Sequence, residues 1–138
     1  MKIFLDANIL VSVLNKEFPL FSYSSRLLSL CGSKKYDIFT SPVCLAIAFY
    51  FAEKKNGNLL ARKKIELLAE HISITETNQS TVSKTVRNKK IHDFEDGLEY
   101  YSAVHSGCKC IVTEDTGDFY FSEIEVLGTV EFFEKYVF

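Results

Sequence analysis

Three aspartates stand at positions from which their side chains could share one site. Asp6 directly follows the apolar run Ile3-Phe4-Leu5, and Asp115 comes two residues after a second apolar run, Cys110–Thr113. Both runs are typical of buried strands in a parallel sheet, whose carboxyl ends form the edge at which open α/β proteins bind ligands. Asp96 lies in the first turn of the helix predicted before the second run, so it should reach the same edge.

Carboxylates that lie this close together predict a bound cation. Two like charges about 4 Å apart repel by roughly 1 kcal/mol in water and by ~4 kcal/mol at an effective dielectric of 20. A proton or a hard cation that prefers oxygen ligands, Mg²⁺ or Mn²⁺, relieves that repulsion. We therefore predict Asp6, Asp96 and Asp115 as catalytic and metal-binding residues, with Asp118 in the same loop as a further ligand. Such a metal can polarise a phosphodiester and generate a hydroxide nucleophile.

The neighbouring acids also have structural interpretations. Asp93 is better placed to cap the helix that begins at Phe94 than to bind a metal. Asp118 could equally cap its loop, and both interpretations stay open. Glu95 and Glu99 are expected to face solvent or to complement the start of the helix.

The elements that must position these residues alternate along the chain. The pattern predicts strands at Ile3–Leu5, Asp37–Thr40, Ile72–Thr75, Cys110–Thr113 and Glu125–Leu127, with helical patterns between them. Asn8 is predicted to cap the first helix, and the helix from Val43 to Lys55 is apolar nearly all round, which predicts burial. This order predicts one α/β domain over residues 1–138, with helices on both faces of a mostly parallel central sheet of four to five strands.

Composition limits the classes of function. The 138 residues suit one domain, and 47% apolar residues exclude a disordered chain. A formal net charge of −2 argues against strong nonspecific binding of nucleic acid, so any such contact must be local. No signal peptide or membrane-spanning segment is evident, which predicts a cytoplasmic protein. The four cysteines lack a zinc-site spacing and are expected to be buried free thiols.

Four stretches of this sequence resemble the PIN-domain family, the fold of VapC-like toxin ribonucleases. Phe4–Leu10 resembles the family's apolar strand followed by Asp-x-Asn, and Asp93–Ala103 resembles the Asp-Phe-Glu-Asp-Ala helix of one subgroup. Ser41–Ala46 resembles the second strand–helix junction, and Ile111–Phe119 resembles the family's last acidic loop. The resemblance spans nearly the whole chain, in the right order and spacing.

The resemblance implies a three-layer α/β/α fold and a metal-dependent endoribonuclease that uses Mg²⁺ or Mn²⁺. By it, Asp6 and Asp96 would be direct metal ligands, and Asp115 and Asp118 would complete the cluster directly or through water. Thr113 would orient a carboxylate or a phosphate, and Asn8 would support the site. The resemblance also implies an RNA substrate, a cognate antitoxin protein and a homodimer, with no membrane.

Two positions depart from the family pattern. The third helix of the family usually carries a glutamate where this chain has Ile47, and Glu53, nearly two turns further on, cannot replace it. Gly97 stands where the family usually has alanine, at a cost of up to about 1 kcal/mol to the helix. The alternative function is therefore a catalytically impaired PIN-fold module that binds RNA or a protein partner.

A third hypothesis, from another class, is a phosphoryl-transfer or receiver domain with Asp6 as phosphate acceptor. The sequence disfavours it, because such phosphatases need Asp-x-Asp followed by Thr and this chain has Asp6-Ala7-Asn8-Ile9. A receiver would need a lysine after a late strand, where this chain has Glu114 and Asp115.

Basic and aromatic residues offer further candidates. Arg87, Lys89 and Lys90 precede the acidic helix and are candidates to bind RNA phosphates, although a solvated helix end is the simpler explanation. The aromatic run Phe49–Phe51 is expected in the core. Phe18, Phe21 and Tyr23 could form an exposed patch for a partner.

Overall fold

A computed structural model describes all 138 residues and contains one sheet of five parallel strands. The strands are β1 (Lys2–Leu5), β2 (Asp37–Thr40), β3 (Ser73–Ile74), β4 (Cys110–Val112) and β5 (Glu125–Leu127), in the order β3-β2-β1-β4-β5. All five predicted strands are therefore present, and the predicted α/β class is confirmed. The sheet is entirely parallel.

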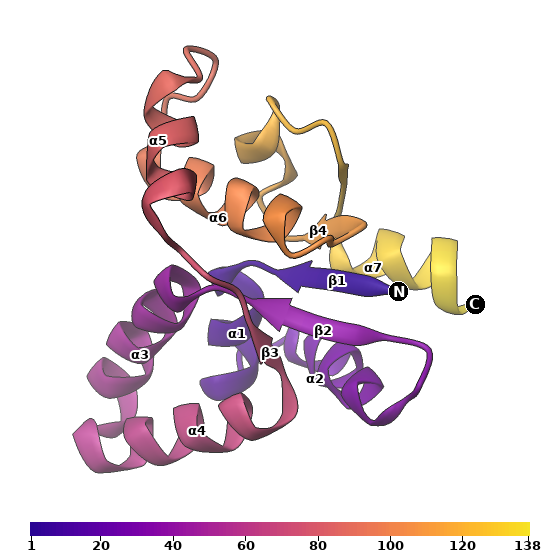
Figure 1. Cartoon of the computed structure of the whole chain (residues 1–138). Helices are drawn as coiled ribbons and strands as arrows, with labels where there is room; N and C mark the ends of the chain where they lie inside the picture. Colours follow the sequence, from indigo (N-terminus) through magenta and orange to yellow (C-terminus); the bar gives the residue numbers. More distant parts are fainter.

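Seven α-helices connect and cover these strands (Figure 1). They are α1 (Ala7–Leu14), α2 (Phe21–Ser29), α3 (Pro42–Asn56), α4 (Asn58–His71), α5 (Gln79–Arg87), α6 (Phe94–His105) and α7 (Thr129–Phe132). Short 3₁₀ turns follow α2 (Leu30–Gly32) and β4 (Thr116–Phe119), and a π turn (Phe133–Val137) continues α7. None of the helices combines the length and the hydropathy needed to cross a bilayer.

The strand order creates a topological switch point between β1 and β4. From β1 the chain moves outward to β2 and β3, and it then crosses to the other side of β1 to form β4 and β5. Ile3 pairs with Ile38 of β2 on one side and with Cys110 of β4 on the other. In Figure 1 the arrows of β1 and β2 point from right to left, so their carboxyl ends lie on the side of the view where α3 is drawn. A crevice at such a point is the usual ligand site of open α/β sheets.

The two central strands form the middle of the core. Ile3, Phe4 and Leu5 of β1 have no exposed surface, and neither does any residue of β4. These runs are continuously apolar because helices cover both faces of the sheet at its centre, so neither face of Ile3–Leu5 or of β4 meets solvent. A rigid, buried pair of strands thus fixes the positions of the residues that follow each of them.

Two local predictions are wrong. Helix α3 is not buried all round: Cys44, Ala48 and Ala52, at helical spacing, form its buried side, whereas Tyr50 is 58% exposed and Phe51 is 45% exposed. Its partners α1, α4 and α6 leave the remaining side open to solvent. The cap of α1 is Asp6 and not Asn8, since the Ala7 amide donates to Asp6 Oδ1 at 2.6 Å.

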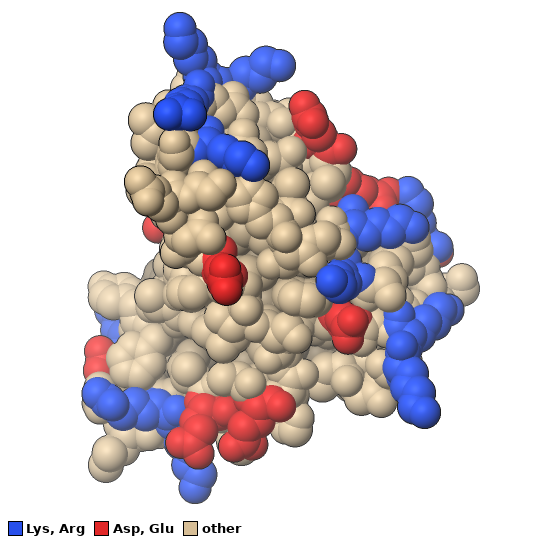
Figure 2. Space-filling view, viewed as in Figure 1, with Lys and Arg blue, Asp and Glu red and all other residues tan.

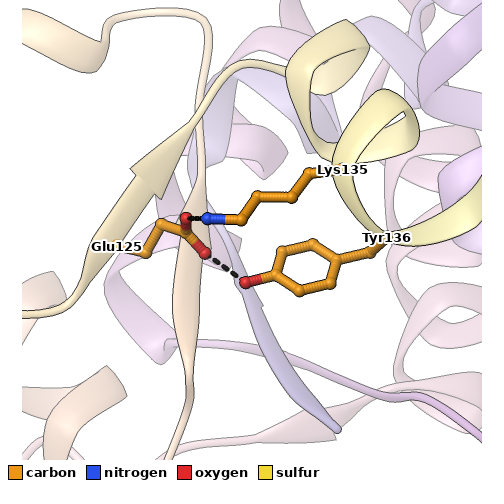
Figure 3. Close-up of polar contacts among 3 residues, drawn as sticks. All are labelled: Glu125, Lys135 and Tyr136. Carbon is orange, nitrogen blue, oxygen red and sulfur yellow. Dashed lines mark hydrogen bonds and ion pairs between the residues drawn. The ribbon is translucent and has the colours of Figure 1, made fainter.

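The C-terminal segment is tied to the edge strand β5. The Glu125 carboxylate accepts from the Lys135 ammonium and from the Tyr136 hydroxyl (Figure 3). Both donors lower the pKa of Glu125 below its usual value. Glu125 is the single acid of the 18 in this chain that forms an ion pair, so the acids at the carboxyl edge have no cationic partner.

Candidate metal centre

An acidic cavity of about 430 Å³ opens at the carboxyl edge of the sheet, beside the switch point. Eight carboxylate side chains line it and no Lys, Arg or His does: they are Asp6, Glu17, Asp93, Glu95, Asp96, Glu99, Asp115 and Asp118. The four aspartates predicted as metal ligands are all among them. The structure therefore brings these four together in one cavity, while their role as ligands stays a prediction.

Asp6 is the most firmly held of these acids. It is 8% exposed, and its Oδ1 accepts from the Ala7 amide at the start of α1. Its Oδ2 accepts from the Thr113 hydroxyl at 2.7 Å. Asp6 follows β1 and caps α1, so its first oxygen is held by the start of that helix. Its second oxygen is held by Thr113, the residue that follows β4.

Thr113 and Asn8 connect Asp6 to Asp115. Thr113 is fully buried, and its Oγ1 accepts from the Asp115 amide at 3.0 Å while donating to Asp6. The Asn8 amide group donates to Thr113 Oγ1 and to Asp115 Oδ2, both at 3.1 Å. The supporting roles predicted for Asn8 and Thr113 are therefore consistent with their contacts, since together they orient two of the acids.

Helix α6 presents a stripe of three acids to the cavity. Asp93, Asp96 and Glu99 are spaced three residues apart, which places them on one face of a helix. Asp93 is the predicted cap, and its Oδ1 accepts from the Asp96 amide at 3.1 Å. The expectation that Glu99 faces solvent is wrong, because it is only 1% exposed. The spacing of three residues between Asp96 and Glu99 was the sequence signal that could have placed Glu99 in the cavity. Glu95 is exposed, as predicted.

Glu99 lies deep in the cavity beside Asp6. The Cys44 thiol of α3 donates to Glu99 Oε1 at 2.7 Å, and the potential ligand atoms of Asp6, Cys44 and Glu99 all lie within 4.8 Å of one another. Burial, together with the negative charge of Asp6, raises the pKa of Glu99 to about 10. Burial and the nearby Glu99 also raise the pKa of the Cys44 thiol.

The pKa values of Asp96 and Asp118, which are more exposed than Glu99, are also raised, by burial and by the neighbouring acids. Burial and the neighbouring Asp93 raise the pKa of Asp96 to about 7, with further contributions from Asp118 and Asp6. The pKa of Asp118 is also raised, by partial desolvation and then by Asp115. Raised pKa values in a group of carboxylates show that the cavity lacks positive charge, which either protons or a cation can supply.

The two departures from the family pattern have separate structural contexts. Ile47 lines the cavity, so α3 contributes an apolar side chain there and no carboxylate. Gly97 faces α5, and a Cβ at this position would lie 2.3 Å from Thr85 Cγ2 and 3.0 Å from Ile91 Cγ2. Glycine at position 97 therefore allows the close approach of α5 to α6, which alanine would prevent.

The basic residues predicted to contact RNA phosphates lie outside the cavity. Arg87 ends α5, and Lys89 and Lys90 follow it, all three exposed. Figure 2 shows Lys and Arg side chains gathered over α5, at the top of the view. None of them lines the acidic cavity, so their role in binding RNA stays a prediction.

An open parallel sheet with unpaired carboxylates at its switch point defines a class of α/β proteins that hold a divalent cation for chemistry on phosphates. The family model described as PIN domain matches residues 2–117, and the chain belongs to this family. The fold and family predicted from the sequence are thereby confirmed.

Similar proteins span almost the whole chain. Ribonuclease VapC1 of Aquifex aeolicus (strain VF5) is 29% identical over 142 residues, covering 98% of this chain and 95% of the relative. Among solved structures, VapBC2 of Rickettsia felis, bound to a promoter DNA fragment, matches with a TM-score of 0.67 at 21% identity, over 92% of this chain and 97% of the other. VapBC-1 of nontypeable Haemophilus influenzae matches with a TM-score of 0.69 at 16% identity, over 94% and 99%. These structures support the fold alone.

Proposed function

We propose that this protein is a metal-dependent endoribonuclease of the VapC-like toxin kind, which hydrolyses phosphodiester bonds of RNA. The observation that carries the proposal is the cavity at the switch point, lined by eight carboxylates and by no cationic side chain. The similarity to a protein named Ribonuclease VapC1 supports the choice of RNA as substrate.

The residues present fit a hard divalent cation, Mg²⁺ or Mn²⁺. Asp6 and Asp96 would hold it directly, and Asp115 and Asp118 would do so directly or through water. All four offer carboxylate oxygens, the ligands that these cations prefer. When bound, such a cation polarises the scissile phosphate and lowers the pKa of a bound water.

The protein's own contribution is to orient these oxygens before the substrate arrives. Thr113 and the Ala7 amide fix the two oxygens of Asp6, and Asn8 fixes Asp115. Hydrogen bonds of this kind behind metal-binding residues set ligand orientation and strengthen binding. The Asp96 side chain is less constrained, because its own amide binds Asp93 while its carboxyl group faces the cavity.

The alternative function, a PIN-fold module without catalysis, rests on Ile47. It predicts a chain that binds RNA or a protein partner but cleaves nothing, and that gains cleavage when Ile47→Glu restores the family's acid. The same assay therefore separates the two functions.

Cleavage of mixed RNA with Mn²⁺, with Mg²⁺ or with a chelator tests the proposal. We expect wild type to cleave only with metal, Asp6→Asn to lose cleavage, and the exposed α4 variant Glu66→Gln to match wild type. If the wild-type protein cleaves no RNA with either metal and the Ile47→Glu variant does cleave it, the alternative function is established. Cleavage that persists in Asp6→Asn would show that the acidic cavity is not the active site.

The proposed function also implies partners and a place of action. A VapC-like toxin acts on cytoplasmic RNA, pairs with an antitoxin and forms a homodimer. An apolar groove of about 300 Å³ lies between α1, α2 and α4, and its lining includes Val13, Leu28 and Leu67. A segment of the antitoxin could bind in this groove. Of the three residues predicted to form a partner patch, Phe18 and Tyr23 are exposed and Phe21 is half-buried. Light scattering of the purified chain tests the dimer.

A further inference from the structure

Two residues from different helices line the acidic cavity, and the family pattern places a glutamate at one of them, position 47. Ile47 reaches it from α3 and Glu99 reaches it from α6. We propose that Glu99 is a ligand of the divalent cation, taking the place of the glutamate that the family carries where this chain has Ile47, and that the Cys44 thiol orients it. This inference rests on the proposed function, because it assigns a role within the same metal centre.

Glu99 is buried without a counter-charge. It is 1% exposed, and no Lys, Arg or His lies within ion-pairing distance of its carboxyl group. Removing a carboxylate from water costs several kcal/mol unless a charge or a full set of hydrogen bonds compensates. In the metal-free cavity, a proton that Glu99 holds in a hydrogen bond with Asp6 supplies this compensation, and a cation bound by both carboxylates would take its place.

The position of Glu99 suits shared coordination with Asp6. Their ligand oxygens lie within 4.8 Å of each other. Oxygens around an octahedral Mg²⁺, at about 2.1 Å from the metal, are about 3 to 4 Å apart. Small rotations of the Glu99 side chain therefore suffice to place both carboxylates around one cation. Asp96 lies one helical turn earlier on the same face of α6, so this helix can supply two ligands.

Helix α3 supplies a hydrogen-bond donor where the family has an acid. Cys44 and Ile47 are three residues apart on neighbouring positions of α3, where Ile47 lines the cavity and the buried Cys44 contacts Glu99. The Cys44 thiol donates to Glu99 Oε1, and no backbone amide or cationic side chain donates to Oε2. The thiol thus holds the carboxyl group by one oxygen, and the same carboxyl group lies within hydrogen-bonding reach of Asp6, with which it would share the cation. The missing carboxylate of α3 and the added carboxylate of α6 are two parts of one rearrangement.

Manganese binding, measured by calorimetry and by electron paramagnetic resonance, tests the inference without depending on cleavage. We expect Glu99→Gln to weaken Mn²⁺ binding by at least about 10- to 100-fold, the range that perturbed metal-site residues show. Glu66→Gln, which removes an exposed carboxylate of α4, should bind like wild type. The double variant Ile47→Glu with Glu99→Gln should recover binding, because it returns the carboxylate to the family's position.

A second pair of variants tests the role of Cys44. Cys44→Ala removes the donor and should weaken Mn²⁺ binding less than Glu99→Gln does, whereas Cys44→Ser should retain most of it. Far-UV circular dichroism and the melting temperature report whether each variant is folded. If Glu99→Gln does not fold, Glu99→Asp, which withdraws the carboxylate by one methylene, should still show weaker binding than wild type.

The outcomes separate this inference from the proposed function. Unchanged Mn²⁺ binding in a folded Glu99→Gln variant, with metal-dependent cleavage intact, overturns the role of Glu99 and leaves the nuclease standing. Wild-type protein that neither binds Mn²⁺ nor cleaves RNA overturns both.

Discussion

The Thr113 hydroxyl donates to Asp6 Oδ2 at 2.7 Å across the switch point between β1 and β4. The two residues are 107 positions apart in sequence and follow adjacent strands, so the sheet itself sets their separation. Both side chains are buried, and the same hydroxyl also accepts from Asn8 and from the Asp115 amide. The Thr113 side chain therefore helps to orient Asp6, Asn8 and Asp115 together.

Removing that hydroxyl should weaken the site and the fold together. Thr113→Val keeps the shape but leaves Asp6, Asn8 and the Asp115 amide short of a partner, at about 1–3 kcal/mol of unfolding free energy. We also expect Mn²⁺ affinity to fall by about 10- to 100-fold. Urea unfolding and calorimetry measure the two effects. Thr113→Ser, which keeps the hydroxyl, is the control, and equal Mn²⁺ affinity in the two variants would contradict the assigned role.

Stability of the metal-free protein should fall as the pH rises. The folded pKa values of Glu99 (about 10) and Asp96 (about 7) exceed their ordinary values of 4.5 and 3.8. Below the ordinary values both the folded and the unfolded state hold these protons. Between the ordinary and the raised pKa, only the folded state keeps them, so the unfolded state gains up to about 1.4 kcal/mol per pH unit for the buried Glu99 and less for the partly exposed, solvent-screened Asp96. We expect the melting temperature in chelator to be several degrees lower at pH 8 than at pH 5.

Two additions sharpen this measurement. Glu99→Gln removes one of the titrating groups, so it should flatten the pH dependence and be more stable than metal-free wild type at pH 8. Saturating Mn²⁺ should raise the melting temperature of wild type at pH 8 by binding the folded state alone. A melting temperature that does not change from pH 5 to pH 8 would contradict the crowding of unpaired acids.

Gly97→Ala should destabilise the protein although alanine favours helices by about 1 kcal/mol. The new methyl group would lie 2.3 Å from Thr85 Cγ2, and overpacking of this kind costs typically about 1–3 kcal/mol. Thr85→Ser removes that methyl and keeps the hydroxyl bond to the Thr81 carbonyl, so it should rescue much of the loss in the double variant. Chemical unfolding of the four proteins gives the coupling between the two sites, and additive effects would count against a direct clash.

Reversing the charges of Arg87, Lys89 and Lys90 tests whether this basic segment binds RNA. If it does, glutamates there should raise KM for RNA by roughly tenfold or more without changing Mn²⁺ affinity. The slope of log affinity against log salt should fall by about 0.7 for each RNA phosphate that the variant no longer neutralises. Reversal of Lys54, Arg62 and Lys63, exposed on α3 and α4, matches the change in net charge. Equal KM values for the two triple variants would favour a simple solvated helix end.

The fold was predictable because its strands carry strong local signals. The two central strands, β1 and β4, are short apolar runs that end near an aspartate at the sheet edge, and this pattern also located most of the metal centre. The burial of α3 was not predictable from its apolar composition, because burial depends on which neighbours pack against it. Tyr50 and Phe51 are exposed since α1, α4 and α6 cover only one side of that helix.

Glu99 was missed for a different reason. Its residue type and its place in an acidic helix suggest a solvated side chain, and only its spacing of three from Asp96 indicates the cavity face. Its hydrogen bond with Cys44 joins residues 55 positions apart, a relationship that no local pattern contains. The glycine at position 97 likewise has its explanation in Thr85, on another helix.

The hydrogen bond between Cys44 and Glu99 has a consequence for how inactive relatives are recognised. A PIN domain without an acid at the α3 position would be classed as a pseudoenzyme if residues were compared only along aligned columns. In the role proposed for Glu99, a carboxylate supplied from α6, one turn after Asp96, replaces the α3 acid from a different column. Members of the family that lack the α3 acid should therefore be compared by the positions of their side chains in three dimensions. An acid on α6 beside a small hydrogen-bond donor on α3 would mark those in which α6 supplies the metal ligand.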